Sequence, residues 1–182
     1  MFNKMRLENY KGYQKLELEK LQRVNLIAGM NNTGKTSILE AIYLHYDRMA
    51  ADVLVAPLAR RGVQQFSLSA EYIFHPYFHN FNTDTPFKIT IEDSGHKSVA
   101  SYAMVSPENQ HMAINKNSFQ MNSIMSSASI EKNAVEISYS LDNKPQGKST
   151  IQIVNNQIEM QVKIDPVHTS TSKRVVVFVP AS

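Results

Sequence analysis

The chain has 182 residues, 42% of them hydrophobic, and a formal net charge of +3 at pH 7. This length and composition predict one sizeable core, or one core with a smaller lobe, and exclude a largely disordered chain. The small excess of basic residues is too diffuse to diagnose nucleic-acid binding. The sequence contains no cysteine, which excludes disulfides, thiol nucleophiles and Cys-based zinc sites and agrees with a reducing cytoplasm.

The sequence also lacks the features of a membrane or secreted protein. No apolar run approaches the roughly 18 residues that span a bilayer, so no membrane partner is expected. The N-terminus carries Glu8 among alternating polar residues and does not have the pattern of a signal peptide.

The first 50 residues are predicted to form the core of a nucleotide-binding fold. Met5–Tyr10 and Leu16–Glu19 alternate apolar with polar residues and predict two half-buried strands, with a break at Lys11-Gly12. Val24–Ala28 is a short, largely apolar and β-rich run and predicts a buried strand that enters the next loop.

That loop is Gly29-Met30-Asn31-Asn32-Thr33-Gly34-Lys35-Thr36, which has the G-x-x-x-x-G-K-[ST] form of a phosphate-binding P-loop. Backbone N–H groups of such a loop surround the phosphates, Lys35 adds a positive charge, and the Thr36 hydroxyl is the expected magnesium ligand. Apolar residues at helical spacing between Thr36 and Arg48 predict a helix whose positive end faces the anion. The motif therefore predicts binding of a nucleoside triphosphate with Mg²⁺.

Residues 51–86 are predicted to form an irregular or helical connection, because several prolines and Gly62 interrupt any regular spacing of apolar residues. Phe66–Phe74 fits either a helix or a strand. His75 and His79 have a spacing that would suit a metal on a helix, but Pro76 opposes a helical interior there. Packing with the neighbouring aromatic residues is the favoured interpretation.

Residues 87–172 are predicted to form an antiparallel β lobe. Strands are expected over 87–93, 98–105, 135–141, 149–154 and 158–164, separated by polar turns such as Ser94-Gly95. The segment 115–129 has no clear period and predicts a mobile loop. The apolar stretch within 173–182 predicts a buried strand that returns to the core sheet.

Two stretches, Met5–Gly12 and Leu21–Ile42, resemble the opening of ABC-type ATPases of the SMC, RecF and OLD (overcoming lysogenisation defect) group. The strongest similarity is to OLD-like AAA-family ATPases of bacterial phage-defence systems, in which an "NFKG" element precedes "LIxGxNNxGKTSILEAI". The resemblance implies an α/β P-loop NTPase of ABC-head type, with a mixed central sheet and an antiparallel β-subdomain.

The resemblance also implies residue roles. Lys11 would reach the phosphates from the second strand, although an exposed turn lysine is the alternative. Gln64 or Gln65 would correspond to the glutamine of the family's Q-loop. The phosphate cradle would consist of Gly29, Asn31, Asn32, Thr33, Gly34, Lys35, Thr36 and Ser37, with Lys35 as the catalytic lysine and Thr36 on magnesium.

Two elements of a complete ABC ATPase are not found in the sequence. It contains neither a signature segment of the LSGGQ type nor four apolar residues followed by Asp-Glu. We therefore expect the N-terminal part of one ATPase head, incomplete at its C-terminus, which binds ATP without hydrolysing it.

Three functional classes follow from these observations. In the first, the chain is part of an OLD-like assembly or sensor ATPase in antiphage defence, which forms homo-oligomers through head pairing and has a nuclease or toxin partner. The second is a RecF- or SMC-like ATPase that clamps DNA. The third, a P-loop kinase or GTPase, would need an acidic metal ligand and lid residues that the sequence does not offer convincingly.

Overall fold

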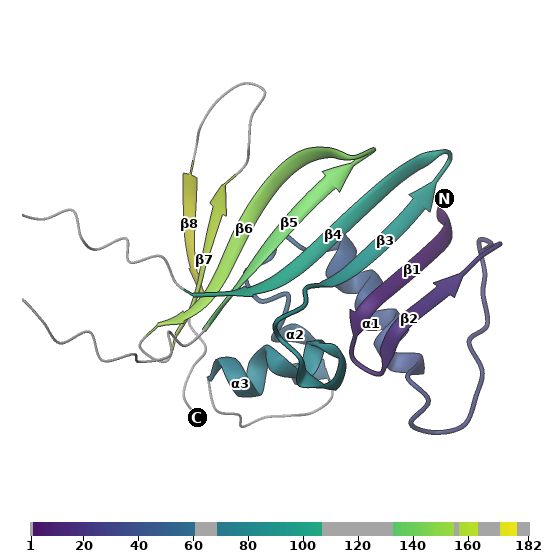
Figure 1. Cartoon of the computed structure of the whole chain (residues 1–182), viewed down its shortest axis with the longest axis horizontal. Helices are drawn as coiled ribbons and strands as arrows, with labels where there is room; N and C mark the ends of the chain where they lie inside the picture. The colour runs from purple at the N-terminus through teal and green to yellow at the C-terminus, as the bar shows by residue number, and fades with distance from the viewer. Residues whose placement is uncertain (1, 61–68, 107–132, 155–156, 164–171, 178–182) are drawn as a thin grey trace, which may run out of the picture.

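The computed structural model describes residues 2–60, 69–106, 133–154, 157–163 and 172–177. Its main element is one eight-stranded antiparallel sheet in the order β2-β1-β3-β4-β5-β6-β7-β8 (Figure 1). The strands are β1 Phe2–Tyr10, β2 Tyr13–Leu18, β3 Phe87–Asp93, β4 His96–Val105, β5 Ala134–Leu141, β6 Lys144–Val154, β7 Gln157–Lys163 and β8 Ser172–Val177.

Helices lie to one side of this sheet and below its lower edge in Figure 1. The longest, α1 (Lys35–Tyr46), passes behind the strands. The shorter elements are α2 Ala56–Arg60, α3 Ala70–Ile73 and the 3₁₀ turns η1 His75–Tyr77 and η2 His79–Phe81. None of the helices in the described ranges has the length and apolar character needed to cross a bilayer.

The core lies between α1 and the sheet. Ile38, Ala41 and Leu44 recur every three residues along α1 and are buried, as expected of a helix that presents one apolar stripe. The strands alternate correspondingly, so that Met5 and Leu7 of β1 are buried while Lys4 and Arg6 point away from α1. Truncating a fully buried leucine such as Leu44 to alanine typically costs about 2–5 kcal/mol.

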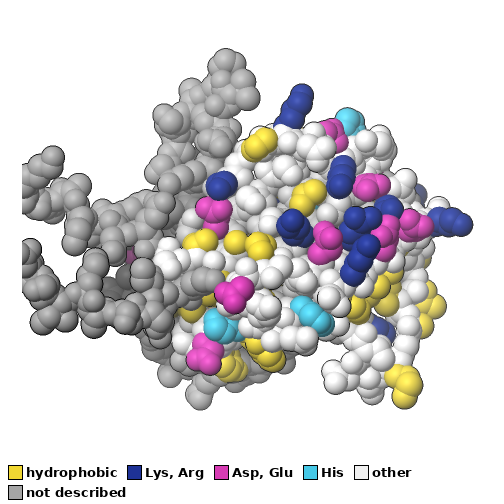
Figure 2. All heavy atoms as spheres, in the orientation of Figure 1, with side chains coloured by type: hydrophobic (Ala, Val, Ile, Leu, Met, Phe, Trp, Pro, Cys, Tyr) yellow, Lys and Arg dark blue, Asp and Glu magenta, His cyan; other side chains and the backbone are white. Residues whose placement is uncertain are grey.

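The opposite face of β1 and β2 carries charged residues of both signs (Figure 2). Lys4 forms ion pairs with Glu17 and Glu19, and Arg6 also pairs with Glu17. The hydrogen bonds from Lys4 and Arg6 lower the pKa of Glu17 to about 2. Because these charges neutralise one another, the face does not form a basic surface of the kind that binds nucleic acid.

The sheet joins regions that the sequence analysis separated. β1 pairs with β2 on one side and with β3 on the other, so the N-terminal strands and the antiparallel lobe share one sheet. The expected returning strand is present as β8, but it pairs with β7 at the far edge of the sheet rather than entering a separate core sheet. All pairings between the described strands are antiparallel, and the described residues therefore do not contain the expected mixed central sheet.

The prediction of a buried strand over Val24–Ala28 is wrong for this structure. No strand is assigned there, and Val24 and Leu26 are 86% and 92% exposed. A strand that is buried on both faces needs neighbouring strands to satisfy its backbone and cover its side chains. The described part of the chain places no strand beside this segment.

Candidate functional site

The P-loop leads directly into α1, as the motif requires. The loop ends at Gly34 and the helix begins at Lys35, with the Ile38 N–H donating to the Gly34 carbonyl at 3.2 Å. The Lys35 ammonium donates to the carbonyls of Gly29 and Met30 at 2.9 and 2.6 Å. The lysine therefore folds back over the loop and places its charge against the backbone carbonyls of the loop's first two residues.

Gly34 is required at its position for two reasons. Its φ of 88° lies in the left-handed region, which residues with a Cβ rarely adopt. A Cβ at this position would also lie 2.8 Å from Cζ of Tyr13, whose hydroxyl donates to the Thr33 carbonyl at 3.2 Å. Tyr13 thus packs against the second glycine and fixes the conformation of the loop.

The N-terminus of α1 has the properties of an anion site. Its N-cap is a glycine, no side chain caps the first turn, and that turn contains no acidic residue. The N–H groups at the start of a helix have no intrahelical partner, and the helix dipole favours a negative charge beside them. With the Lys35 ammonium at the same end, these groups suit the phosphates of a nucleotide.

The remaining cradle residues lie around this loop. Asn31, Asn32, Thr33 and Thr36 are exposed, and Asn32 has a φ of 63°. The exposed Thr36 hydroxyl side chain is available at the start of α1, which fits its expected role as the ligand of a nucleotide-bound Mg²⁺. The described residues contain no cluster of three or more acidic or histidine side chains that would bind a metal by itself.

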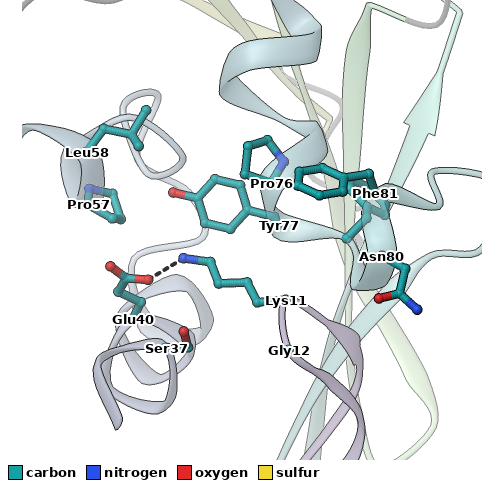
Figure 3. A pocket seen from close by; sticks show the side chains of 11 residues that line it. Lys11, Gly12, Ser37, Glu40, Pro57, Leu58, Pro76, Tyr77, Asn80 and Phe81 are labelled. Carbon is teal, nitrogen blue, oxygen red and sulfur yellow. Dashed lines mark hydrogen bonds and ion pairs between the residues drawn. The ribbon is translucent and has the colours of Figure 1, made fainter. Parts of the chain in front are cut away.

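Lys11 lies near the start of α1 but is not directed at the loop. It forms an ion pair with Glu40, one turn beyond the start of the helix, and both side chains are largely buried. Lys11 and Glu40 line one cavity together with Ser37, the residue that follows the P-loop threonine (Figure 3). The structure thus brings Lys11 and Ser37 to a common cavity and gives Lys11 a carboxylate partner.

The far end of α1 is anchored to the sheet by polar contacts. Tyr102 of β4 donates its hydroxyl to the Leu44 carbonyl at 2.7 Å, and His45 Nε2 lies 2.9 Å from the Ser98 hydroxyl. Burial, together with the charge of Arg48, lowers the pKa of His45 to about 4, so that this histidine is neutral at pH 7. These contacts fix the axis of the helix whose opposite end follows the P-loop motif.

Other predicted positions have different outcomes. His79 Nδ1 makes a hydrogen bond of 2.8 Å with the Lys11 carbonyl, which connects η2 to the β1–β2 turn and gives this ring a structural partner. Pro76 lies in η1, which is one 3₁₀ turn rather than a longer helix. Gln64, Gln65 and the segment 115–129 lie outside the described residues, as do the first three residues of Phe66–Phe74, and the described remainder of that stretch contains the helix α3.

Sequence reasoning missed Tyr13 and Glu40. Tyr13 follows Lys11-Gly12 and contacts a loop 20 residues away, and no spacing rule indicates such a contact. Glu40 carried a weak signal, since it is an acidic residue beside the apolar stripe of α1. A buried carboxylate generally needs a cationic partner, which would have directed attention to nearby lysines.

Comparison with known proteins places the chain in a family. The profile of the AAA ATPase domain matches residues 1–174. An uncharacterized protein of Methanocaldococcus jannaschii is 46% identical over 44 residues, which are 24% of this chain and 20% of that protein. The DNA replication and repair protein RecF of Bacillus thuringiensis and of Bacillus cereus is 48% identical over 42 residues, 23% of this chain and 11% of RecF.

These curated relatives are thus matched over a fifth of their length or less. No solved structure matches the chain significantly. The family match covers nearly the whole sequence and agrees with the P-loop at the head of α1. The chain belongs to the AAA ATPase domain family.

Proposed function

We propose that the protein binds ATP with Mg²⁺ at the P-loop and, as part of a complete ATPase head, hydrolyses it. The observation that carries this proposal is the position of Lys35, whose ammonium rests on two loop carbonyls beside the uncapped N-terminus of α1. A triphosphate offers that ammonium stronger, charged acceptors than backbone carbonyls.

Each residue of the loop then has a defined task. Backbone N–H groups of the loop and of the first turn of α1 bind the phosphate oxygens, while Lys35 turns from the carbonyls to the outer phosphates. Bound Mg²⁺ supplies charge neutralisation between the outer phosphates, and the Thr36 hydroxyl is the residue that would hold it. Tyr13 keeps the loop in the conformation that these contacts need.

We further propose that the chain is part of an ABC-type head. The exposed apolar side chains of Val24, Leu26 and Met30 support this, because an ABC head covers the strand before the P-loop with further strands of a mixed sheet. In that arrangement two heads pair, so the active protein is a homo-oligomer. The resemblance to OLD-like ATPases supports a role as an assembly or sensor subunit in antiphage defence, with a nuclease or toxin partner.

A RecF-like role in DNA repair is the second candidate. The 48% identity to RecF over 42 residues supports it, but this short match carries no information on DNA contacts. The two candidates differ in phenotype. Defence predicts that the protein lowers the plating efficiency of phages without affecting survival of DNA damage, and repair predicts the reverse.

The binding proposal is tested by calorimetric titration with ATP and Mg²⁺. Lys35→Ala should abolish tight binding, because the variant loses the charge that faces the phosphates while keeping the fold. Lys15→Ala is the matched control, since it removes one exposed lysine from β2 and leaves the loop intact. Unchanged affinity in Lys35→Ala would refute the P-loop assignment.

A further inference from the structure

The cavity beside the P-loop has a volume of about 340 Å³ and lies between the first turns of α1, the short helix α2 and the η1–η2 segment (Figure 3). Ser37 lines one side, directly after the last residue of the P-loop motif. The cavity therefore begins where the phosphate cradle ends. Its volume is within the range of about 300–1,000 Å³ that small-molecule sites occupy.

Most of the cavity wall is apolar or aromatic. Pro57 and Leu58 lie on the α2 side, and Pro76, Tyr77 and Phe81 lie on the η1–η2 side (Figure 3). The polar groups are few, namely Ser37, the Asn80 carboxamide and the Lys11–Glu40 pair. A flat, largely apolar ring with a polar edge fits such a lining better than a charged group does.

Phe81 is an unusual wall residue. Its side chain is 68% exposed although the neighbouring Tyr77 and Phe78 are buried. Both Asn80 and Phe81 have left-handed backbones, with φ of 52° and 58°, which is rare for non-glycine residues and generally costs about 1–3 kcal/mol each. Hydrogen bonds from Phe81 N to Phe78 O and from Asn82 N to His79 O, at 3.1 and 3.0 Å, hold this turn. The turn keeps the ring out of the core and places it in the cavity wall.

We propose that this cavity holds the nucleoside half of the bound triphosphate, with the base stacked on Phe81 and its polar edge hydrogen-bonded to the Asn80 carboxamide. The inference rests on the proposed function, because the phosphates fix where the nucleoside lies. From the loop the chain of phosphates runs past Ser37, so that the ribose and base enter the cavity. The apolar ring of Phe81 then exchanges contact with water for contact with the base.

This arrangement predicts that the loop binds the phosphates and the cavity binds the nucleoside, and binding experiments can separate the two contributions. Inorganic tripolyphosphate carries the phosphates without a nucleoside and engages only the phosphate-binding groups, those of the loop and Lys35 among them. ATP engages both the loop and the cavity. Loss of the ring on which one base stacks weakens binding by about 5- to 150-fold, which corresponds to a stacking energy of about 1–3 kcal/mol. Phe81→Ala should therefore lower the affinity for ATP by this factor and leave the affinity for tripolyphosphate unchanged.

Variants at Tyr72 and at Phe81 itself serve as controls. Tyr72→Ala removes an aromatic side chain that is 47% exposed on α3 and does not line the cavity, so ATP affinity should not change. Phe81→Tyr keeps the ring and should keep the affinity, whereas Phe81→Leu keeps an apolar side chain without a ring and should lose most of it. Thermal unfolding of each variant shows whether the fold is intact.

The outcomes distinguish this inference from the proposed function. A wild-type protein that binds neither ATP nor tripolyphosphate refutes the P-loop proposal, and this inference with it. A wild-type protein that binds both ligands equally tightly overturns only the nucleoside site. The same conclusion follows if Phe81→Ala binds ATP as the wild type does, or if it loses both ligands to the same extent.

Discussion

The Lys11 ammonium, in the turn between β1 and β2, forms an ion pair with the Glu40 carboxylate of α1 and lies 4.6 Å from the centre of the Tyr77 ring. The side chains of Lys11 and Glu40 are only 15% and 10% exposed. A phosphate that contacts Lys11 therefore has to share the ammonium with this carboxylate or displace it. We expect the nucleotide to compete with Glu40 for this positive charge.

The first prediction concerns this competition. Lys11→Ala should lower the affinity for ATP by about tenfold or more, because a hydrogen bond to a charged group contributes about 1.5–3 kcal/mol. The affinity for adenosine should fall much less, because adenosine carries no phosphate. Glu40→Gln should strengthen ATP binding, since it leaves Lys11 free to move to the phosphates. Both effects are measured by titration of the folded variants, with Lys15→Ala as the control for loss of one positive charge.

A double-mutant cycle decides whether the two effects share one cause. The gain from Glu40→Gln should become smaller when residue 11 is already alanine, because no ammonium remains to be released. If the two effects add independently, Lys11 is a structural partner of Glu40 and does not contact phosphate.

The second prediction concerns Gly34. Gly34→Ala should lower stability and weaken ATP binding, because the alanine would have to adopt a φ of 88° and its Cβ would collide with the ring of Tyr13. Gly95→Ala is the matched control, because Gly95 has a φ of 86° and open space at its Cβ position. Urea unfolding should show a larger loss for Gly34→Ala than for Gly95→Ala.

The difference between these two glycine variants measures the collision alone. Adding Tyr13→Ala to Gly34→Ala should recover that difference by removing the ring. Equal losses at Gly34 and Gly95 would show that the loop moves away from Tyr13 at no cost, and that Tyr13 does not fix its conformation.

The third prediction is a pH dependence that originates at His45. Its pKa is lowered from 6.5 in the unfolded chain to about 4 in the fold, first by burial and then by the charge of Arg48. Above pH 6.5 the ring is neutral in both states and contributes no pH dependence. As the pH falls from 6.5 towards 4, the unfolded chain binds a proton that the folded protein does not, so stability is lost over this interval.

The size of this loss of stability follows from the shift in the pKa of His45. By pH 4 the wild type should lose about 3 kcal/mol of unfolding free energy relative to His45→Gln, which cannot titrate. Urea unfolding of both proteins at pH 7, 5.5 and 4.5 measures it, and the other titrating groups cancel in the comparison. Parallel pH profiles for the two proteins would show that His45 is protonated in the folded state as readily as in the unfolded chain.

Local pattern predicted much of the fold. The alternation of apolar and polar residues gave the strand Phe87–Asp93 with the bounds that the structure has, and it gave β5 to within one residue. The P-loop motif gave the start of α1 to within one residue. These elements are encoded locally, by strand alternation and by the glycine, lysine and threonine of the loop.

Contacts between distant segments could not be predicted in this way. Val24–Ala28 has the composition of a buried strand, but whether it is one depends on neighbouring strands, which the described residues do not supply. The Lys11–Glu40 pair joins residues 29 apart, and the turn at Asn80 and Phe81 adopts a left-handed backbone without glycine. The cavity combines the β1–β2 turn, α1, α2 and the η1–η2 segment, and no single stretch of sequence indicates it.

The last prediction is that the 182-residue chain binds ATP without turnover, and that hydrolysis needs further catalytic residues and a second copy of the head. Hydrolysis requires a carboxylate that positions the attacking water and the metal, and the sequence contains no apolar strand followed by Asp-Glu. Binding by the loop and Lys35 holds the phosphates but leaves the water unplaced, so positioning and charge stabilisation remain incomplete. Steady-state phosphate release by the purified chain, over a range of concentrations, measures turnover, with Lys35→Ala as the control for contaminating activity. Turnover that rises with chain concentration and disappears in Lys35→Ala would contradict this prediction, and would place a catalytic carboxylate within residues 50–182.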